Sequence, residues 1–115
     1  MMSDQQHVEP VGFAGQLLPE HMAQVAAKGF RSVINNRPDL EGGTDQPTSA
    51  QIEEAARAAG LHYVFQPVVA GQMTQFDVEV FARHFHELPK PVLMFCRTGN
   101  RSSSLYQAAK QMDLV

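Results

Sequence analysis

The sequence predicts an α/β domain with a small, mostly parallel sheet of about four strands flanked by helices. From residue 11 onward, short apolar runs alternate with segments in which apolar residues recur at helical spacing. One of those runs, residues 92–96, is apolar throughout, which is typical of a strand buried on both faces of a parallel sheet. Strands that alternate with helices form right-handed βαβ units, so we expect helices on both faces and this strand near the centre.

The first two expected strands lie near the start of the chain. Residues 11–16 form a weak strand interrupted by glycine. The helix that follows begins near Pro19, a residue that a first helical turn tolerates, and ends at Gly29. Residues 30–35 form the second strand. The chain then enters a long turn rich in Gly, Asp and Pro, which ends at Pro47.

Capping signals define the two middle helices. Thr48 and Gln51 have the spacing of a capping box, and the apolar residues behind them keep the spacing of a buried helix face as far as Gly60. Residues 61–69 form the third strand. Thr74 can cap the next helix, and a pair of prolines ends that helix before the continuously apolar strand.

The chain has 115 residues, which fits one domain, and we expect residues 11–115 to form it behind a polar tail of residues 1–10. The net charge of −3 excludes a strong field that would draw the protein to nucleic acid or to an anionic membrane. The start is too polar for a secretory signal, and no apolar run is long enough to span a bilayer. Since the single cysteine cannot form an internal disulfide, we expect a cytoplasmic protein.

The chemistry is expected in the segment that joins strand 92–96 to the last helix. Cys96 ends the strand at the carboxyl edge of the sheet, where ligands bind in such folds. Gly99 permits a positive φ or a close backbone approach, so the N–H groups of the loop can turn inward. These donors and the helix start near Arg101 should hold the pKa of Cys96 below the ordinary ~8.5. We therefore predict a reactive thiolate and, in Arg101, a planar fork for an oxyanion.

The other side chains of this segment fit an anion site. A buried, inert cysteine followed by a helix-capping serine is the simpler alternative, but it leaves the glycine and the two arginines unexplained. We expect no metal, because His84 and His86 lie two apart on one helix and face different ways. We expect no cofactor, because no glycine-rich nucleotide loop is present. The predicted anion-binding set is Arg97, Thr98, Gly99, Asn100, Arg101, Ser102 and Ser103.

A cysteine and an arginine that bracket a strand-loop-helix turn resemble the active loops of both tyrosine phosphatases and rhodanese sulfurtransferases. The resemblance of the whole chain is closest to the beta-lactamase-hydrolase-like phosphatase-domain family. It implies the fold of dual-specificity and tyrosine phosphatases, in a small bacterial domain that stands alone or is fused or operon-linked to a sulfur dioxygenase. It also implies a further helical piece beyond Val115. The segments that carry it are GQLLPE (15–20), SVINNRPDLEG (32–42), AAGLHYVFQPV (58–68) and VLMFCRTGNRSSSLYQA (92–108).

The chain departs from tyrosine phosphatases in three places. Only four residues separate Cys96 from Arg101, which is the rhodanese spacing, where phosphatases have five. Phe95 stands where they usually have histidine, and residues 67–72 hold no general-acid aspartate. Without an acid, an alkoxide or phenoxide leaves more slowly, by a factor of roughly 10²–10⁴ in rate. Sulfane-sulfur transfer needs no proton on its leaving group. Asp39 is either a displaced acid or an ordinary turn residue.

Three functions follow, in order of expectation. The lead is a sulfurtransferase that carries sulfane sulfur as a Cys96 persulfide and passes it to an external thiol or sulfite. The alternative is a phosphatase that works through a Cys96 phosphocysteine, and the third is a non-catalytic anion-binding module. Each of them takes a small anionic substrate or ligand. Arg37 is either a second anion clamp or a solvated turn charge, and Asn35 and Asn36 are expected to bond the local backbone.

Overall fold

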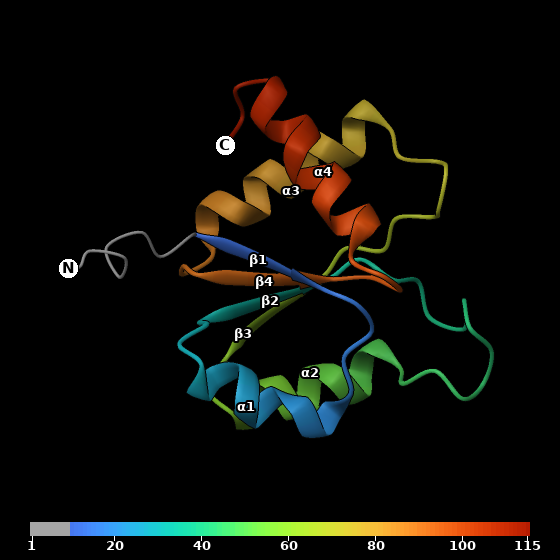
Figure 1. Cartoon of the computed structure of the whole chain (residues 1–115), viewed down its shortest axis with the longest axis vertical. Coiled ribbons are helices and arrows are strands. Elements are labelled where there is room, and N and C mark those ends of the chain that lie inside the picture. Colours follow the sequence, from blue (N-terminus) through green and yellow to red (C-terminus); the bar gives the residue numbers. More distant parts are fainter. Residues whose placement is uncertain (1–9) are drawn as a thin grey trace.

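The computed structural model describes residues 10–115, which form a parallel four-stranded sheet between two helical layers (Figure 1). This arrangement confirms the predicted α/β fold class. The expected polar tail falls, apart from Pro10, outside the described residues. The strands are β1 (Val11–Ala14), β2 (Ser32–Asn35), β3 (His62–Phe65) and β4 (Val92–Phe95).

The helices divide between the two faces of the sheet. Figure 1 shows α1 and α2 beneath the sheet and α3 and α4 above it. A single 3-10 turn, η2, leads into α1, so the first predicted helix is shorter than its sequence pattern indicated. The helical segments are η2 (Pro19–His21), α1 (Met22–Ala27), α2 (Ser49–Ala58), α3 (Gln75–Glu87) and α4 (Asn100–Gln111).

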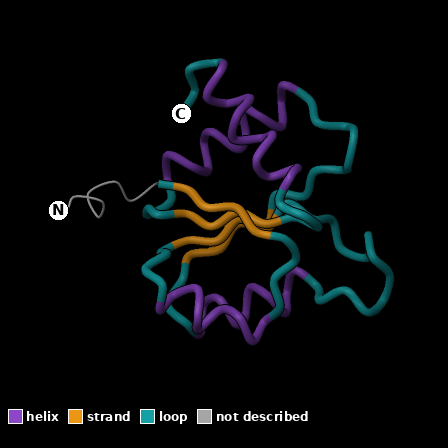
Figure 2. Tube along the Cα trace, viewed as in Figure 1, coloured by secondary structure: helices purple, strands orange, loops and turns teal. Residues whose placement is uncertain are grey.

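The sheet order is β1-β4-β2-β3, and every neighbouring pair is parallel. The apolar strand β4 therefore lies between β1 and β2, which confirms its predicted central position. Since all strands run the same way, the loops that follow them leave the sheet at one edge, on the right of Figure 2. Segments that are far apart in the sequence meet at this edge.

The two predicted helix caps are present. The Thr48 hydroxyl accepts a hydrogen bond from Gln51 N at 3.1 Å, and the Gln51 side chain accepts one from Thr48 N at 2.9 Å. Thr74 and Asp77 repeat this reciprocal pair at the start of α3, at 3.2 and 2.9 Å. Each cap satisfies N–H groups that a helix leaves unpaired at its start.

Two apolar clusters, one on each face, hold the helices to the sheet. Because side chains alternate along a strand, β4 contributes to both of them. Val92 and Met94 pack in the cluster beneath α3 and α4, and Leu93 and Phe95 pack in the cluster with α1 and α2. No helix among residues 10–115 is long and apolar enough to cross a bilayer.

The third strand ends four residues earlier than the apolar pattern predicts, at Phe65 instead of residue 69. Pro67 lacks the N–H that a further ladder bond would need. The chain nevertheless stays beside β2 for a short distance, since Gln66 N donates to Asn35 O and Val68 N donates to Asn36 O, both at 2.9 Å. The segment after β3 is therefore fastened to the end of β2.

Candidate active site

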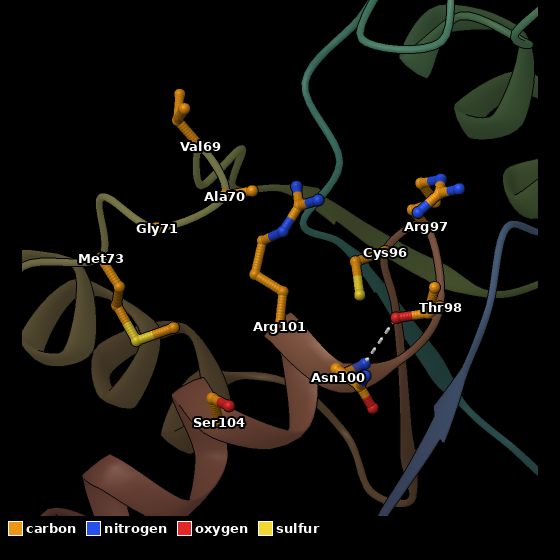
Figure 3. Close-up of a pocket in the computed structure, with 10 residues that line it drawn as sticks. All are labelled: Val69, Ala70, Gly71, Met73, Cys96, Arg97, Thr98, Asn100, Arg101 and Ser104. Carbon is orange, nitrogen blue, oxygen red and sulfur yellow. Dashed lines mark hydrogen bonds between the residues drawn. The ribbon is translucent and has the colours of Figure 1, made fainter.

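The loop between β4 and α4 borders a pocket of about 600 Å³ at the carboxyl edge of the sheet. Figure 3 shows the pocket with Cys96 and Arg101 on the side of β4 and α4, and with the segment before α3 opposite them. The residues that line it are Val69, Ala70, Gly71, Met73, Cys96, Arg97, Thr98, Asn100, Arg101 and Ser104. The predicted cysteine and arginine thus border the same space.

Gly99 forms the bend of this loop for both of the predicted reasons. Its φ of +94° lies in the left-handed region, which side chains rarely adopt. A Cβ at this position would also lie 3.3 Å from the carbonyl oxygen of Ala14 in the neighbouring strand β1. This left-handed residue is the N-cap of α4, which begins at Asn100, four residues after Cys96.

The Cys96 sulfur receives the hydrogen bonds that the loop was predicted to supply. Gly99 N donates to Sγ at 3.1 Å. Cys96 is 1% exposed, and its burial alone would raise the pKa of the thiol. The N–H groups of Ser102, Thr98 and Gly99 and the Ser102 hydroxyl outweigh that effect, so the pKa lies below the ordinary value. At any given pH, the thiolate fraction of Cys96 is therefore larger than that of an unperturbed thiol.

The lowered pKa predicts how alkylation of Cys96 depends on pH. The rate with iodoacetamide follows the thiolate fraction, which rises as pH passes upward through the pKa. We expect a midpoint clearly below the ~8.5 of a free thiol. Because Cys96 is the single cysteine, the mass of the alkylated chain reports this site alone. A midpoint at or above that of free cysteine would contradict the thiolate assignment.

Arg101 is held at the pocket by two other loops. Its Nη1 and Nη2 donate to the Glu41 carboxylate at 3.0 and 3.1 Å, and Nη1 also donates to the Val68 carbonyl at 2.9 Å. A guanidinium has five N–H donors, so these bonds leave Nε–H and one Nη2–H. Those two lie on one edge of the planar group, which suits two oxygens of an oxyanion.

Glu41 is the site residue that the sequence interpretation missed. Its carboxylate accepts from Arg101 and from Arg37 Nε, the latter at 2.9 Å. Burial would raise the pKa of Glu41, but the hydrogen bonds and charges of Arg101 and Arg37 lower it further than burial raises it. Glu41 is therefore ionised at neutral pH. It orients Arg101 and has no proton to give to a leaving group.

Arg37 and Asp39 do not border the pocket. Arg37 is 9% exposed and contacts Glu41 and the Gln16 side chain, so it stands behind Glu41 as a support. The exposed Asp39 accepts from Ser49 N at 2.8 Å, at the start of α2. This local backbone contact fits the second alternative for Asp39, an ordinary turn residue. The catalytic role considered for Asp39 and the anion-binding role considered for Arg37 stay predictions.

The remaining loop residues fall into two groups. Arg97, Thr98 and Asn100 are exposed and line the pocket, as does Ser104, which the sequence interpretation did not include. Ser102 and Ser103 do not line it. Ser103 N donates to Gly99 O as part of the first turn of α4. The fully buried Ser102 faces inward, with its hydroxyl at the Asn36 side chain.

Among residues 10–115, the pocket lining contains two arginines and no carboxylate. The segment opposite Cys96 contributes Val69, Ala70, Gly71 and Met73, which are apolar or lack a side chain. The carboxylate at the edge of the site is Glu41, and it is bonded to two arginines. The described part of the pocket therefore combines a thiol of lowered pKa with a guanidinium that has two unbonded donors, and its lining holds no carboxylic acid.

Known proteins resemble this chain in sequence and in fold. Residues 5–112 match the family model for the phosphatase-like domain of beta-lactamase hydrolase-like protein. The chain is 36% identical to the beta-lactamase hydrolase-like protein of Agrobacterium fabrum over 91% of its own length. It spans only 24% of that relative, so most of the relative lies outside the match.

Two solved structures have a similar backbone. A "putative phosphatase" from Neisseria meningitidis superposes with a TM-score of 0.81 at 36% identity, covering 90% of this chain and 75% of that one. P. aeruginosa TpbA, solved in complex with pTyr, superposes with a TM-score of 0.62 at 18% identity, covering 90% and 61%. The second likeness concerns the fold alone.

Proposed function

The chain belongs to the family of the phosphatase-like domain of beta-lactamase hydrolase-like protein, and on that premise we propose that it is a cysteine-dependent, phosphatase-like hydrolase. This is the alternative from the sequence interpretation, and it displaces the sulfurtransferase as the leading function. The observation that carries it is the 3.1 Å hydrogen bond from Gly99 N to the Cys96 sulfur, in a pocket that Arg101 also borders.

The proposed reaction has two steps. The Cys96 thiolate attacks phosphorus, a phosphorus–sulfur bond forms, and the leaving group departs with the electron pair of its bond to phosphorus. Water then attacks the phosphocysteine, the sulfur leaves as a thiolate, and the proton of the water passes to bulk solvent. Arg101 binds two phosphoryl oxygens through its remaining Nε–H and Nη2–H donors. The N–H groups of the loop stabilise the sulfur in both steps.

The absence of an acid in the pocket restricts the substrates. Glu41 is ionised, and the segment opposite Cys96 carries no carboxylate, so the leaving group must depart as an anion. We propose that the enzyme accepts phosphoric esters or anhydrides whose leaving group is a weak base, such as an acidic phenol or a carboxylate. Alkyl phosphates should react poorly, because an alkoxide needs a proton to leave.

A series of aryl phosphates tests this proposal. We expect kcat/KM to fall steeply as the pKa of the phenol rises, from about 7 for nitrophenol toward about 10 for phenol, since no proton transfer offsets the charge on the leaving oxygen. Rapid quenching and intact mass spectrometry should reveal phosphate on Cys96. If no aryl phosphate is hydrolysed, or if hydrolysis leaves the cysteine unmodified throughout turnover, the proposal is wrong.

Sulfur transfer remains a second candidate because of the same missing acid. Four residues separate Cys96 from Arg101, and a thiolate that attacks sulfane sulfur expels sulfite or a thiolate without a proton. Treatment with thiosulfate, followed by intact mass spectrometry, separates the two candidates. Addition of one sulfur atom to Cys96 without any aryl phosphate hydrolysis would favour the sulfurtransferase.

A further inference from the structure

Asn36 lies at the junction of the segments that carry the active-site groups. It is fully buried just after β2. Its backbone N donates to Phe95 O at 2.8 Å, beside Cys96, and its carbonyl accepts from Val68 N at 2.9 Å. The side-chain Nδ2 donates to Gln66 O at 2.9 Å, and Oδ1 accepts from the Ser102 hydroxyl at 2.8 Å.

This arrangement was not expected from the sequence, which suggested that Asn36 bonds the local backbone. Its side chain instead reaches Ser102, 66 residues further along the chain. The neighbouring Asn35 behaves partly as expected, since its Oδ1 accepts from Arg37 N, two residues on. Parallel strand order accounts for the difference, because β2 pairs directly with β4 and brings Asn36 beside the loop that follows β4.

The Ser102 hydroxyl stands between two acceptors but has one hydrogen. One acceptor is Asn36 Oδ1, at 2.8 Å. The other is the Cys96 sulfur, whose pKa a hydrogen bond from the same hydroxyl lowers. The Asn36 amide cannot simply turn over to offer a donor, because Gln66 O holds its Nδ2 in place. When the hydrogen turns to the sulfur, Oδ1 is left buried without a partner, which is unfavourable.

We propose that Asn36 is a positioning residue that competes with the Cys96 sulfur for the single hydrogen of Ser102. With a neutral thiol, the hydrogen lies on Asn36. With a thiolate, the sulfur draws the hydrogen at the expense of the amide oxygen. Asn36 thereby keeps the thiolate less stabilised, and more nucleophilic, than the donors around it would otherwise make it.

In the proposed reaction, on which this step rests, the hydrogen returns to Asn36 as the thiolate attacks and its negative charge passes into the new phosphorus–sulfur bond. It turns to the sulfur when the phosphorus–sulfur bond breaks and negative charge returns. The charged groups that face the sulfur are Arg97 and Arg101 from its own loop, with Glu41 behind Arg101. The segment from Val69 to Met73 brings none, so a change at Asn36 alters no charge near Cys96.

The test is the pH midpoint of Cys96 alkylation in single and double variants. Asn36→Ala removes the competing acceptor, so the midpoint should fall by about 1 pH unit below that of the wild type. Ser102→Ala removes the donor, so the midpoint should rise. In the Ser102→Ala background, Asn36→Ala should cause no further change. Asn36→Val fills the same space without an acceptor and gives the same reading if the alanine variant does not fold.

Asn35→Ala is the matched control. Asn35 is 3% exposed, and its side chain makes two hydrogen bonds, to Tyr63 and Arg37, and neither involves Ser102. The alanine variant loses both bonds. We expect thermal unfolding to shift in both asparagine variants and the midpoint to move only with Asn36. An unchanged or raised midpoint in Asn36→Ala, or a shift that persists without the Ser102 hydroxyl, would overturn the inference. Alkylation needs no turnover, so such a failure leaves the proposed hydrolase untouched.

Discussion

Replacement of Cys96 by serine is expected to lower kcat/KM for aryl phosphates by roughly 10⁴-fold or more. A serine hydroxyl has almost the same size as the thiol but stays protonated, because the N–H groups that favour a thiolate cannot ionise an alcohol at neutral pH. The two other hydroxyl side chains of the pocket lining, Thr98 and Ser104, are un-ionised alcohols like the new serine, so neither should replace the thiolate in attacking a phosphoryl group bound at Arg101. The measurement is steady-state hydrolysis together with the mass of the quenched enzyme.

Ser104→Ala is the control for this loss. Ser104 lines the same pocket and is exposed, and its replacement should leave hydrolysis within about twofold of the wild type. The Cys96→Ser protein should still bind inorganic phosphate, since the donors of the loop and of Arg101 remain. Hydrolysis that persists in Cys96→Ser would show that the chemistry does not pass through the sulfur.

Arg101→Lys is expected to reduce kcat/KM by roughly 10²- to 10³-fold, although the charge is kept. The guanidinium bonds Glu41 twice and the Val68 carbonyl once, and it retains an edge with two donors for an oxyanion. A lysine ammonium is a compact charge whose N–H groups do not lie in one plane, so it cannot donate all of these hydrogen bonds at once. The loss should appear in kcat as well as in KM, because the oxygens gain charge in the transition state.

The control for that substitution is Arg97→Lys in the same loop. Arg97 is exposed, and the exchange should change kcat/KM by no more than a few-fold. Thermal unfolding of both lysine variants separates a folding defect from a defect in catalysis. If Arg101→Lys retains activity within about threefold, its planar fork does not hold the transferring group.

Much of the fold could be predicted because its signals are local. Thr48 with Gln51 and Thr74 with Asp77 are caps within one helical turn, so the sequence window that contains them also contains their partners. The run that became β4 is apolar on both faces because helices cover both. Strand β3 was predicted too long, since hydrophobicity continues past Phe65 while Pro67 ends the ladder.

The geometry of the loop after β4 could also be predicted, but the residues that support it could not. Cys96, Gly99 and Arg101 lie within six residues, so their roles can be argued from one turn. Glu41 was missed and Asp39 was chosen in its place, although the two are separated by Leu40 alone. Leu40 has a φ of +67°, a left-handed conformation that a periodicity pattern does not foresee. Glu41 and Arg37 at i,i+4 spacing were the available signal.

The contact between Asn36 and Ser102 could not be predicted for a related reason. The two residues become neighbours only through the strand order, which the sequence does not state. Phe95 shows the opposite case. Side chains alternate along β4, so that of Phe95 points to the face of the sheet that α1 and α2 cover. It is fully buried in the apolar cluster there. The residue before the nucleophile is therefore part of the core.

The strand order also has a consequence for biosynthesis. Strands β1 and β2 are the first to be made, yet neither pairs with the other, because β4 must enter between them. A nascent chain therefore cannot close its sheet until the residues of β4 have left the ribosome, after those of the other three strands. Until then, β1 has no partner strand, and β2 can pair only with β3 and has one unpaired edge. The strand that leads directly into Cys96 is thus also the one that completes the sheet.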